Sequence, residues 1–287
     1  MNPPLRLRLL TRADLPFADS LRTLAGWNQT PADWERFLAL ELDGCFLAEW
    51  NGTPAGTATT TVYGSELAWI GMVLVHPDHR RRGIGRALLE KCMEHLRGRG
   101  VRCTKLDATP DGQKVYDALG FKTEWTLTRW ERGIAPVSPA ARDSRIRNWQ
   151  STDAAVVEQF DVDAFGVSRC RLIETLAEQS LGALVWEAEP GRIAGYGLLR
   201  PGSRALYLGP VAARSPDMAV QLIEALIGQC GGGKIFWDIP DQNAVAVTFA
   251  EQHGFVAQRP LTRMHLGENV APGEPPNVFG IAGPEFG

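Results

Sequence analysis

The segment from Val73 to Leu89 is the feature that most constrains the fold of this chain. It reads Val-Leu-Val-His-Pro-Asp-His-Arg-Arg-Arg-Gly-Ile-Gly-Arg-Ala-Leu-Leu, which predicts a buried strand, a turn closed by proline, an arginine-rich glycine loop and the start of a helix. Gly83 and Gly85 carry no Cβ atom that would keep a ligand away from the backbone. The helix start adds unpaired N–H groups and the positive end of the helix dipole. The segment therefore predicts a binding site for an anion.

Two common phosphate-binding loops are excluded by the residues that follow. A nucleoside triphosphate loop ends in Gly-Lys-Ser/Thr, and a dinucleotide fingerprint has a third glycine three residues after the second. In this chain Gly85 is followed by Arg86, Ala87 and Leu88, which fit neither pattern. We therefore expect the ligand to be a polyphosphate that binds without a metal ion.

The loop also resembles that of a known family. Arg80, Gly83 and Gly85 form the pattern Arg-x-x-Gly-x-Gly behind a strand that ends Val-x-Val-x-Pro. This pattern resembles the pyrophosphate loop of the GNAT superfamily of N-acyltransferases, which implies acetyl-CoA as cosubstrate and no metal. A basic loop that merely caps a surface helix is the alternative, and it would not need the strand, loop and helix in this order.

The composition bounds the class of protein. With 287 residues, of which 44% are hydrophobic, the chain can bury a large core, and its length suits two domains better than one. A formal net charge of −3, with Arg80–Arg82 as a short basic run, argues against binding to nucleic acid. The five cysteines lack Cys-x-x-Cys spacing, and no apolar run has the length of a membrane span, so we expect a cytoplasmic protein that binds no membrane.

Residues 5–132 have the hydrophobic patterns of a series of strands and helices. Thr30, Pro31 and Asp33 supply an N-cap, a first-turn proline and a first-turn acid, and Asn51-Gly52 between two apolar runs predicts a hairpin. The order strand, helix, helix, three strands, helix, strand, helix, strand is similar to that of the GNAT fold. We expect strands at 5–9, 45–50, 56–62, 67–75, 103–108 and 121–130, and helices at 14–24, 30–42, 84–98 and 111–119.

The remaining sequence repeats this order, which indicates an internal duplication. Trp69-Ile-Gly-Met-Val73 corresponds to Tyr207-Leu-Gly-Pro-Val211, and Leu119-Gly-Phe121 corresponds to His253-Gly-Phe255. An unrelated α/β domain, the alternative, would have to produce the same order by chance. We predict an α/β (α+β) protein with two tandem GNAT-like domains, each a mixed, mostly antiparallel sheet flanked by helices: a coenzyme-binding domain at 1–133, a linker at 134–142, a second domain at 143–267 and a tail at 268–287 without a strong element. The oligomeric state stays open between a monomer and a homodimer.

The second copy lacks the residues of the anion site. Counted from Gly209, Gln221 and Ile223 fall where the first copy has its two glycines, and Met218 falls in place of Arg80. Side chains at these positions predict a blocked backbone site. We therefore expect the coenzyme only in the amino-terminal domain, with the second domain supporting the fold or lining the substrate site.

Acetyl transfer from a thioester to an amine needs a neutral nucleophile, a stabilised oxyanion and a proton for the departing thiolate. The resemblance to GNAT enzymes implies that backbone groups of Val73, Leu74 and Val75 hold the pantetheine arm and the thioester. It also implies that the loop holds the pyrophosphate, through Arg80, Arg81, Arg82, Gly83, Ile84, Gly85 and Arg86.

Tyr116 is the candidate for the general acid. It lies four residues before Gly120 on the helix leading into the Gly-Phe pair, where many GNAT enzymes have the tyrosine that protonates the coenzyme sulfur. The alternative is a helix tyrosine that packs its ring and exposes its hydroxyl. The second copy has Ala250 at this place. Thr109 stands where many relatives have an asparagine that contacts the coenzyme, which puts that contact in question.

The sequence identifies the general base less clearly than the general acid. An ammonium must lose a proton to a nearby carboxylate or imidazole, and Glu66, Asp107, His76 and His79 are candidates. For Asp107 the alternative is a cap on the following helix. For Glu66 it is a solvated carboxylate.

Trp27, Asn28 and Gln29 lie between the first two expected helices, in the segment that shapes the acceptor pocket in many GNAT enzymes. They would suit a polar acceptor with an apolar body, unless Trp27 belongs to the core. The combined prediction is an N-acetyltransferase that moves an acetyl group from acetyl-CoA to a small-molecule amine by direct attack. An acyl-CoA-responsive binding protein without turnover and a peptide or protein N-acetyltransferase are the alternatives.

Overall fold

Thirteen strands form one sheet that runs through both halves of the chain, in the order β1-β2-β3-β4-β5-β12-β6-β11-β10-β9-β8-β7, with β13 paired to β10. The computed structural model describes residues 4–136 and 142–287. The amino-terminal half consists of β1 (Leu5–Leu9), α1 (Leu15–Leu24), α2 (Pro31–Leu40), β2 (Cys45–Trp50), β3 (Thr53–Tyr63), β4 (Leu67–Val75), α3 (Ile84–Gly98), β5 (Cys103–Ala108), α4 (Pro110–Ala118) and β6 (Lys122–Arg132).

The carboxyl-terminal half repeats the same order of elements and then adds one short strand. Residues 137–141, within the expected linker, lie outside the described residues. The second half consists of β7 (Ile146–Asn148), α5 (Ala154–Phe165), α6 (Cys170–Glu178), β8 (Gly182–Glu189), β9 (Arg192–Arg200), β10 (Leu206–Ala213), α7 (Pro216–Ile227), β11 (Ile235–Pro240), α8 (Ala244–Gln252), β12 (Phe255–Gly267) and β13 (Val278–Gly280).

Local sequence signals explain where several elements begin. Thr30 is the N-cap of α2. The backbone N–H and the hydroxyl of Thr30 donate hydrogen bonds to the Asp33 carboxylate at 2.7 and 2.9 Å. Asn51 and Gly52 take φ values of 51° and 79° in the turn between β2 and β3, as a two-residue hairpin requires.

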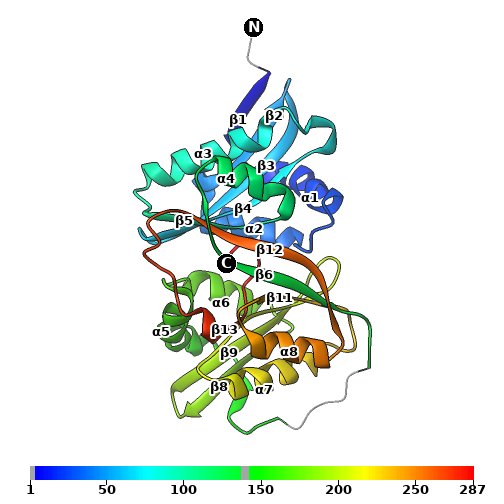
Figure 1. Ribbon diagram of the computed structural model, residues 1–287, viewed down its shortest axis with the longest axis vertical. Coiled ribbons are helices and arrows are strands. Elements are labelled where there is room, and N and C mark those ends of the chain that lie inside the picture. The colour runs from blue at the N-terminus through cyan, green and yellow to red at the C-terminus, as the bar shows by residue number, and fades with distance from the viewer. Residues whose placement is uncertain (1–3, 137–141) are drawn as a thin grey trace.

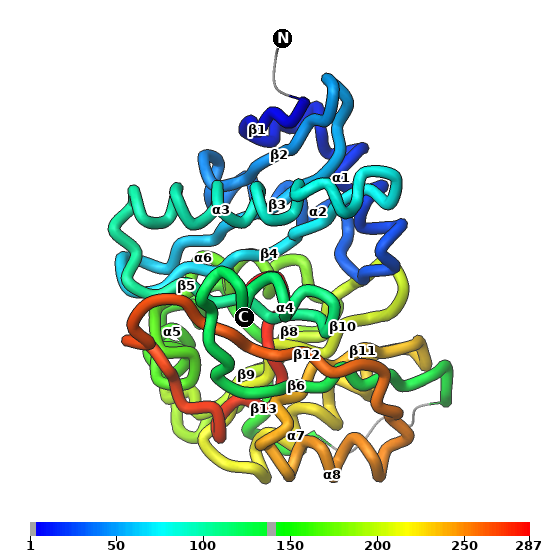
Figure 2. The backbone as a smooth tube through the Cα atoms, turned by 45° about the horizontal axis from the view of Figure 1, so that its top comes forward, coloured from blue at the N-terminus to red at the C-terminus, as the bar shows by residue number. Residues whose placement is uncertain are grey.

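The two halves exchange their last long strands. β12 comes from the carboxyl-terminal half and pairs antiparallel with β5, whereas β6 comes from the amino-terminal half and pairs antiparallel with β11. β6 and β12 also pair with each other, and Figures 1 and 2 show them side by side across the middle of the molecule. Neither half therefore completes its own sheet.

Helices cover both faces of the sheet in each half. In the amino-terminal half, α3 packs on one face of β3 and β4, and α1 and α2 pack toward the other (Figure 1). The carboxyl-terminal half repeats this with α7 on one face and α5 and α6 on the other. A single buried cluster joins the two halves around the end of the chain, where Trp34, Phe165 and Phe286 belong to the same core.

The tail departs from the expectation of weak structure. β13 pairs antiparallel with β10, and the chain then continues into the interior between the halves. Phe286 is fully buried and stacks on Phe37 with 4.7 Å between the ring centroids. The tail therefore docks within its own chain, on β10 and in the shared core.

Candidate active site

The middle of β4 contains a β-bulge. One residue of β3 faces both Met72 and Val73, and Met72 has a φ of 50°. On the other edge of β4, the parallel pairing with β5 ends at Trp69 and Lys105. Beyond this pair the two strands diverge, and within residues 4–136 and 142–287 no strand pairs with that edge of β4. The opening leaves one edge of Val73–Val75 available for backbone contacts with a ligand.

The loop from His76 to Gly83 leads from this opening into α3. Gly83 is the N-cap of α3 and has a φ of 78°, a left-handed conformation that favours glycine. Arg81 also has a positive φ, of 60°. These conformations turn the chain so that the first turn of α3 follows the loop directly.

Six consecutive backbone N–H groups, those of residues 81–86, find no acceptor in the part of the chain that the structure describes. A Cβ atom on Gly85 would touch only a Val75 side-chain carbon, at an ordinary 3.6 Å, so packing within the protein does not require glycine there. The missing side chain leaves space above the amides. The loop and helix start thus offer the unpaired amides and the space that an anion site would need.

The arginines of the loop add positive charge. Arg80, Arg81 and Arg82 are exposed, and none of them forms a salt bridge with a described residue. Arg80 donates from Nε to the carbonyl of Val75 at 3.3 Å, and the Arg82 guanidinium lies 5.2 Å from the ring centroid of Trp50. Arg86 differs, because it pairs with Glu90 one turn later in α3. The loop therefore carries three guanidinium groups without a carboxylate partner among the described residues.

Tyr116 lies on α4 with its ring against the core beneath α3. Its ring makes an edge contact with Phe121 at 5.9 Å, and its hydroxyl bonds to no other described residue. Burial raises the pKa of the Tyr116 hydroxyl to about 12, so the group stays protonated at neutral pH. Thr109 is the N-cap of α4, where its Oγ1 accepts from the Gly112 N–H at 3.3 Å. The Thr109 hydroxyl therefore caps α4.

Asp107 is occupied by a partner that the sequence analysis did not identify. Nε and Nη2 of Arg263, from the exchanged strand β12, each donate to the Asp107 carboxylate at 2.9 Å. The side chains are almost completely buried, at 0% and 7% exposure. Asp238 on β11 and Arg129 on β6 form the equivalent pair in the other half, at 2.8 and 2.6 Å. The pair recurs wherever a strand is exchanged, so Asp107 holds β12 in place.

The other base candidates are separated from one another. Glu66 is exposed in the turn before β4, at the opposite end of that strand from the loop. His76 accepts a hydrogen bond from the Asp78 N–H on its Nδ1 at 3.3 Å, and His79 lies half-buried in the same turn. The structure does not bring Glu66 to the opening.

The segment from Trp27 to Gln29 joins the two halves. Asn28 Oδ1 accepts from the N–H groups of Arg204 and Ala205, and its Nδ2 donates to the Ala205 carbonyl, all at 3.0 Å. Gln29 donates from Nε2 to the Glu285 carboxylate at 2.6 Å. Trp27 is half-buried against the core that both halves share. Asn28 is thus fully engaged in structure, and Gln29 contacts the tail.

The tail lies across the face of β3 and β4 that carries Trp69. Nε1 of Trp69 donates to the Pro284 carbonyl and the Tyr63 hydroxyl donates to the Phe286 carbonyl, both at 2.9 Å. Glu285, which the sequence analysis missed, lies between these contacts. The only sequence signal was an apolar run late in the tail, which gives no indication of where it docks.

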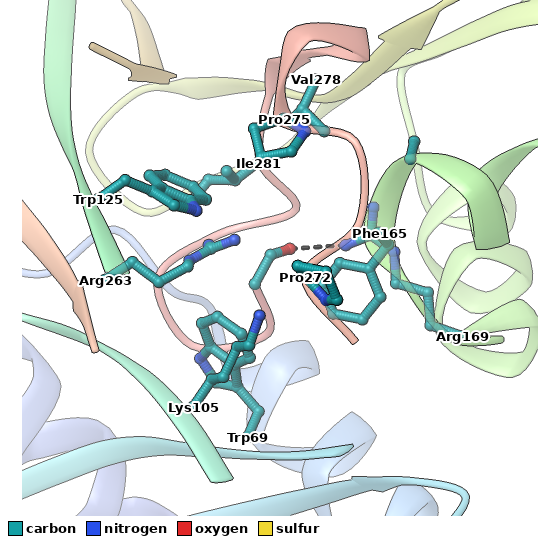
Figure 3. A pocket seen from close by; sticks show the side chains of 12 residues that line it. Trp69, Lys105, Trp125, Phe165, Arg169, Arg263, Pro272, Pro275, Val278 and Ile281 are labelled. Atoms are coloured by element: carbon teal, nitrogen blue, oxygen red, sulfur yellow. Dashed lines mark hydrogen bonds between the residues drawn. The ribbon is translucent and has the colours of Figure 1, made fainter. Parts of the chain in front are cut away.

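A small cavity of about 20 Å³ lies where β4 and β5 diverge. Figure 3 shows Arg263 reaching into it between Trp125 and Trp69, with Arg169 on the opposite side donating to the tail at Gly287. The Arg263 guanidinium is 4.1 Å from the Trp125 ring centroid and 4.5 Å from that of Trp69. Aromatic and cationic side chains therefore line the region beside the opening.

The corresponding opening in the carboxyl-terminal half is filled. β10 pairs with β11 only over Leu206–Leu208, and the next part of the same edge pairs with β13, where Val211 faces Gly280. Nε1 of Trp237 donates to the Phe279 carbonyl at 3.0 Å and fixes β13 on the β11 side. A strand of the chain itself thus occupies the place that stays open beside β4.

The helix start in this half also differs from the sequence-based alignment. Only Arg214 and Ser215 separate β10 from α7, and Ser215 Oγ accepts from the Met218 N–H at 3.4 Å. Gln221 and Ile223 lie within α7, so the expectation that they replace the two glycines was wrong in position. The anion loop is missing because the connection is short, and the helix caps itself.

The described ranges contain no group of three His, Cys, Asp or Glu side chains arranged to hold a metal ion. In the same ranges, no helix is long and apolar enough to cross a membrane.

The comparisons with known proteins agree with this geometry. Residues 15–121 match the family model described as "Acetyltransferase (GNAT) family", and residues 157–280 match the one described as "Acetyltransferase (GNAT) domain". The chain is 28% identical over 178 residues to the "Uncharacterized N-acetyltransferase YitH" of Bacillus subtilis, covering 62% of each protein, which is less than two thirds of that relative. It is 25% identical to the "Holothin acyltransferase" of a Pseudoalteromonas species over 91% of this chain and 87% of that one.

A solved structure shares the whole architecture. The crystal structure of a putative acetyltransferase from Pyrococcus horikoshii matches with a TM-score of 0.85 at 25% identity, over 100% of this chain and 97% of that chain. The two family matches together span most of the sequence, one in each half. The chain is therefore a member of the GNAT superfamily of acetyltransferases, with two GNAT domains in tandem.

Proposed function

We propose that the amino-terminal half binds acetyl-CoA and transfers its acetyl group directly to the amine of a small molecule. The observation that carries the proposal is the row of six unpaired N–H groups at residues 81–86, beside the open edge of β4. The pyrophosphate would accept hydrogen bonds from these amides, and the pantetheine arm would follow the backbone of Val73–Val75. Arg80–Arg82 would add charge.

The carboxyl-terminal half would bind no second coenzyme. β13 occupies the equivalent strand edge, and the two-residue connection before α7 offers no loop amides. This half would instead complete the sheet of the first through β12 and close its acceptor side through the tail.

A small acceptor is favoured over a protein. The tail covers the face of β4 that carries Trp69, and loop 203–205 is bonded to Trp27 and Asn28, so little of this side is open to a folded partner. The Pseudoalteromonas relative named for holothin, which aligns over nearly the whole chain, supports the same choice. An acyl-CoA sensor without turnover and a peptide N-acetyltransferase remain the competing functions.

The transfer would proceed in one step of bond exchange. The neutral amine nitrogen attacks the thioester carbonyl carbon, the C–S bond breaks, and its electron pair stays on sulfur. The Tyr116 hydroxyl gives its proton to the departing thiolate, and the resulting tyrosinate takes back the excess proton of the new amide nitrogen. Cys92 and Cys103 would take no part, because burial raises the pKa of the Cys103 thiol to about 11 and that of the Cys92 thiol further, which keeps both protonated.

Two measurements test the proposal. Calorimetric titration with acetyl-CoA is expected to give one site per chain, and release of free thiol in the presence of a panel of small amines is expected to identify an acceptor. Two equally tight sites, or no binding, would overturn the assignment of the coenzyme to one half. Binding at one site without thiol release from any amine or peptide would favour the sensor.

The five cysteines form no disulfide, which is consistent with the reducing cytoplasm as the place of reaction.

A further inference from the structure

Glu285 is a buried carboxylate at the boundary between the halves, and the transfer described above does not use it. The residue is 7% exposed. Each of the other acidic side chains that are buried in the described ranges has a cationic group within salt-bridge distance. They are Asp33, Glu41, Asp107, Asp153, Asp161 and Asp238. The one side-chain hydrogen bond of Glu285 comes from the neutral amide of Gln29. A buried carboxylate without a cation partner is costly and therefore suggests a function.

The backbone of Glu285 lies against the bulge of β4. A Cβ atom on Gly71 would be 2.8 Å from the Glu285 carbonyl oxygen and 3.3 Å from the Glu285 Cβ. Gly71 directly precedes Met72, where the bulge begins. Glycine is thus required at 71 for the tail to approach this closely. The approach places the Glu285 backbone beside Gly71, two residues beyond Trp69, where the pairing of β4 with β5 ends.

The Glu285 side chain borders a second small cavity. This cavity, of about 20 Å³, is lined also by Gln29, Arg200 and Tyr207 and has room for about one water molecule. The charged or titratable groups that act on Glu285 come from six elements: Asp33, Tyr63, Arg129, Arg200, Tyr207 and Arg259. Burial raises the pKa of Glu285 to about 7, with Arg200 opposing the rise and Asp33 adding to it. Such a group can exchange a proton near neutral pH.

We propose that the Glu285 carboxylate, acting through a water in this cavity, accepts the proton that the acceptor ammonium loses before it attacks the thioester. The inference rests on the proposed function. The ammonium R–NH3⁺ gives one proton to Glu285 and becomes R–NH2. After acetyl transfer, the carboxylic acid returns that proton to solvent. The second proton lost by nitrogen balances the one that Tyr116 gives to sulfur, so the products are the amide, the free thiol and one proton.

The test compares two small amines that differ in basicity. Alaninamide has an α-amine with a pKa of about 8, and butylamine has a pKa near that of lysine, about 10.4, so far less of it is neutral in solution. Glu285→Gln removes the proton acceptor and keeps an oxygen for Gln29, Glu285→Asp keeps a carboxylate, and Glu274→Gln serves as a matched control on an exposed tail carboxylate.

We expect Glu285→Gln to lower kcat/KM for butylamine about 100-fold at pH 7.5 and for alaninamide about 10-fold, within the usual range for general base catalysis. The loss should shrink as pH rises toward 9, because more of each amine is then neutral. Acetyl-CoA affinity should stay unchanged, Glu285→Asp should recover part of the rate, and Glu274→Gln should match the wild type.

An equal loss for both amines at every pH would mean a structural role and overturn the inference. A wild-type rate in Glu285→Gln would do the same. If neither probe amine is acetylated, carbon NMR titration of the labelled Glu285 carboxyl decides: a midpoint between pH 6 and 8 supports the inference, and one below 5 overturns it. Failure of the proposed function would be seen separately, as loss of the single acetyl-CoA site in the wild-type protein.

Discussion

The two halves of this molecule share a fold and the order of its elements, but only one keeps the opening in its sheet. Both exchange a strand with the other half, and both lock that strand with a buried Arg–Asp pair. They differ where the fourth strand leaves the fifth: beside β4 the edge is free and a long loop follows, whereas beside β10 the edge is taken by β13 and the loop is two residues long. The shared features hold the structure, and the features found in one half are those on which the proposed chemistry depends.

Substitutions in the two buried Arg–Asp pairs that hold the exchanged strands should have the largest effects on stability. Arg263→Met leaves the buried Asp107 carboxylate without its partner, and we expect a loss of about 3–5 kcal/mol in the free energy of unfolding, measured by urea denaturation. Arg129→Met should cost a similar amount through Asp238. The exposed pair of Arg102 with Glu268 is the control, since Arg102→Met should change stability by about 1 kcal/mol or less. A large loss of stability in one half alone would show that the buried Arg–Asp pair does not stabilise both halves in the same way.

The anion site gives the sharpest test of the difference between the halves. Gly85→Leu places a side chain over the free amides where the protein itself has space, so we expect acetyl-CoA to bind about 100-fold more weakly, about 3 kcal/mol, at nearly unchanged stability. Asp217→Leu is the matched change near the start of α7. Calorimetry should find its affinity unaltered, and a weakened Asp217→Leu variant would place coenzyme in the second half.

Tyr116 distinguishes catalysis from binding. Tyr116→Phe keeps the ring contact with Phe121 and removes the proton donor, so kcat should fall about 100-fold while the dissociation constant of acetyl-CoA stays the same. Steady-state assays of thiol release and calorimetry on the same preparation measure both. Unchanged turnover would assign the leaving-group proton to another group.

Replacing Asn28 should have the smallest effect, and it should change stability without changing activity. Asn28→Ala removes three hydrogen bonds to residues 204 and 205 and leaves buried backbone groups without partners, which we expect to cost about 1–3 kcal/mol. At a temperature where the variant is folded, kcat/KM should equal that of the wild type. A selective rise in KM for the amine would return Asn28 to the acceptor pocket.

The sequence predicted most of the fold and the order of strand, glycine loop and helix, because these depend on local patterns. The glycine loop, the capping box at Thr30 and the hairpin at Asn51-Gly52 each involve residues close in the chain. The strand exchange was not predictable from the same patterns, since a strand pattern such as that of β6 does not identify the neighbours of the strand. Asp107 was a base candidate for the same reason, because its partner Arg263 is distant from it in sequence. Glu285 and the β4 bulge that its backbone contacts are also distant from each other in sequence.

The exchanged strand also sets the order of events during synthesis. β5 is complete at Ala108, yet its partner β12 ends only at Gly267, so a ribosome adding about 5–20 residues per second leaves that edge bare for on the order of ten seconds or more. An uncovered strand edge is a template for pairing with other chains. The nascent amino-terminal half therefore keeps an unpaired strand edge until the last part of the polypeptide has been made.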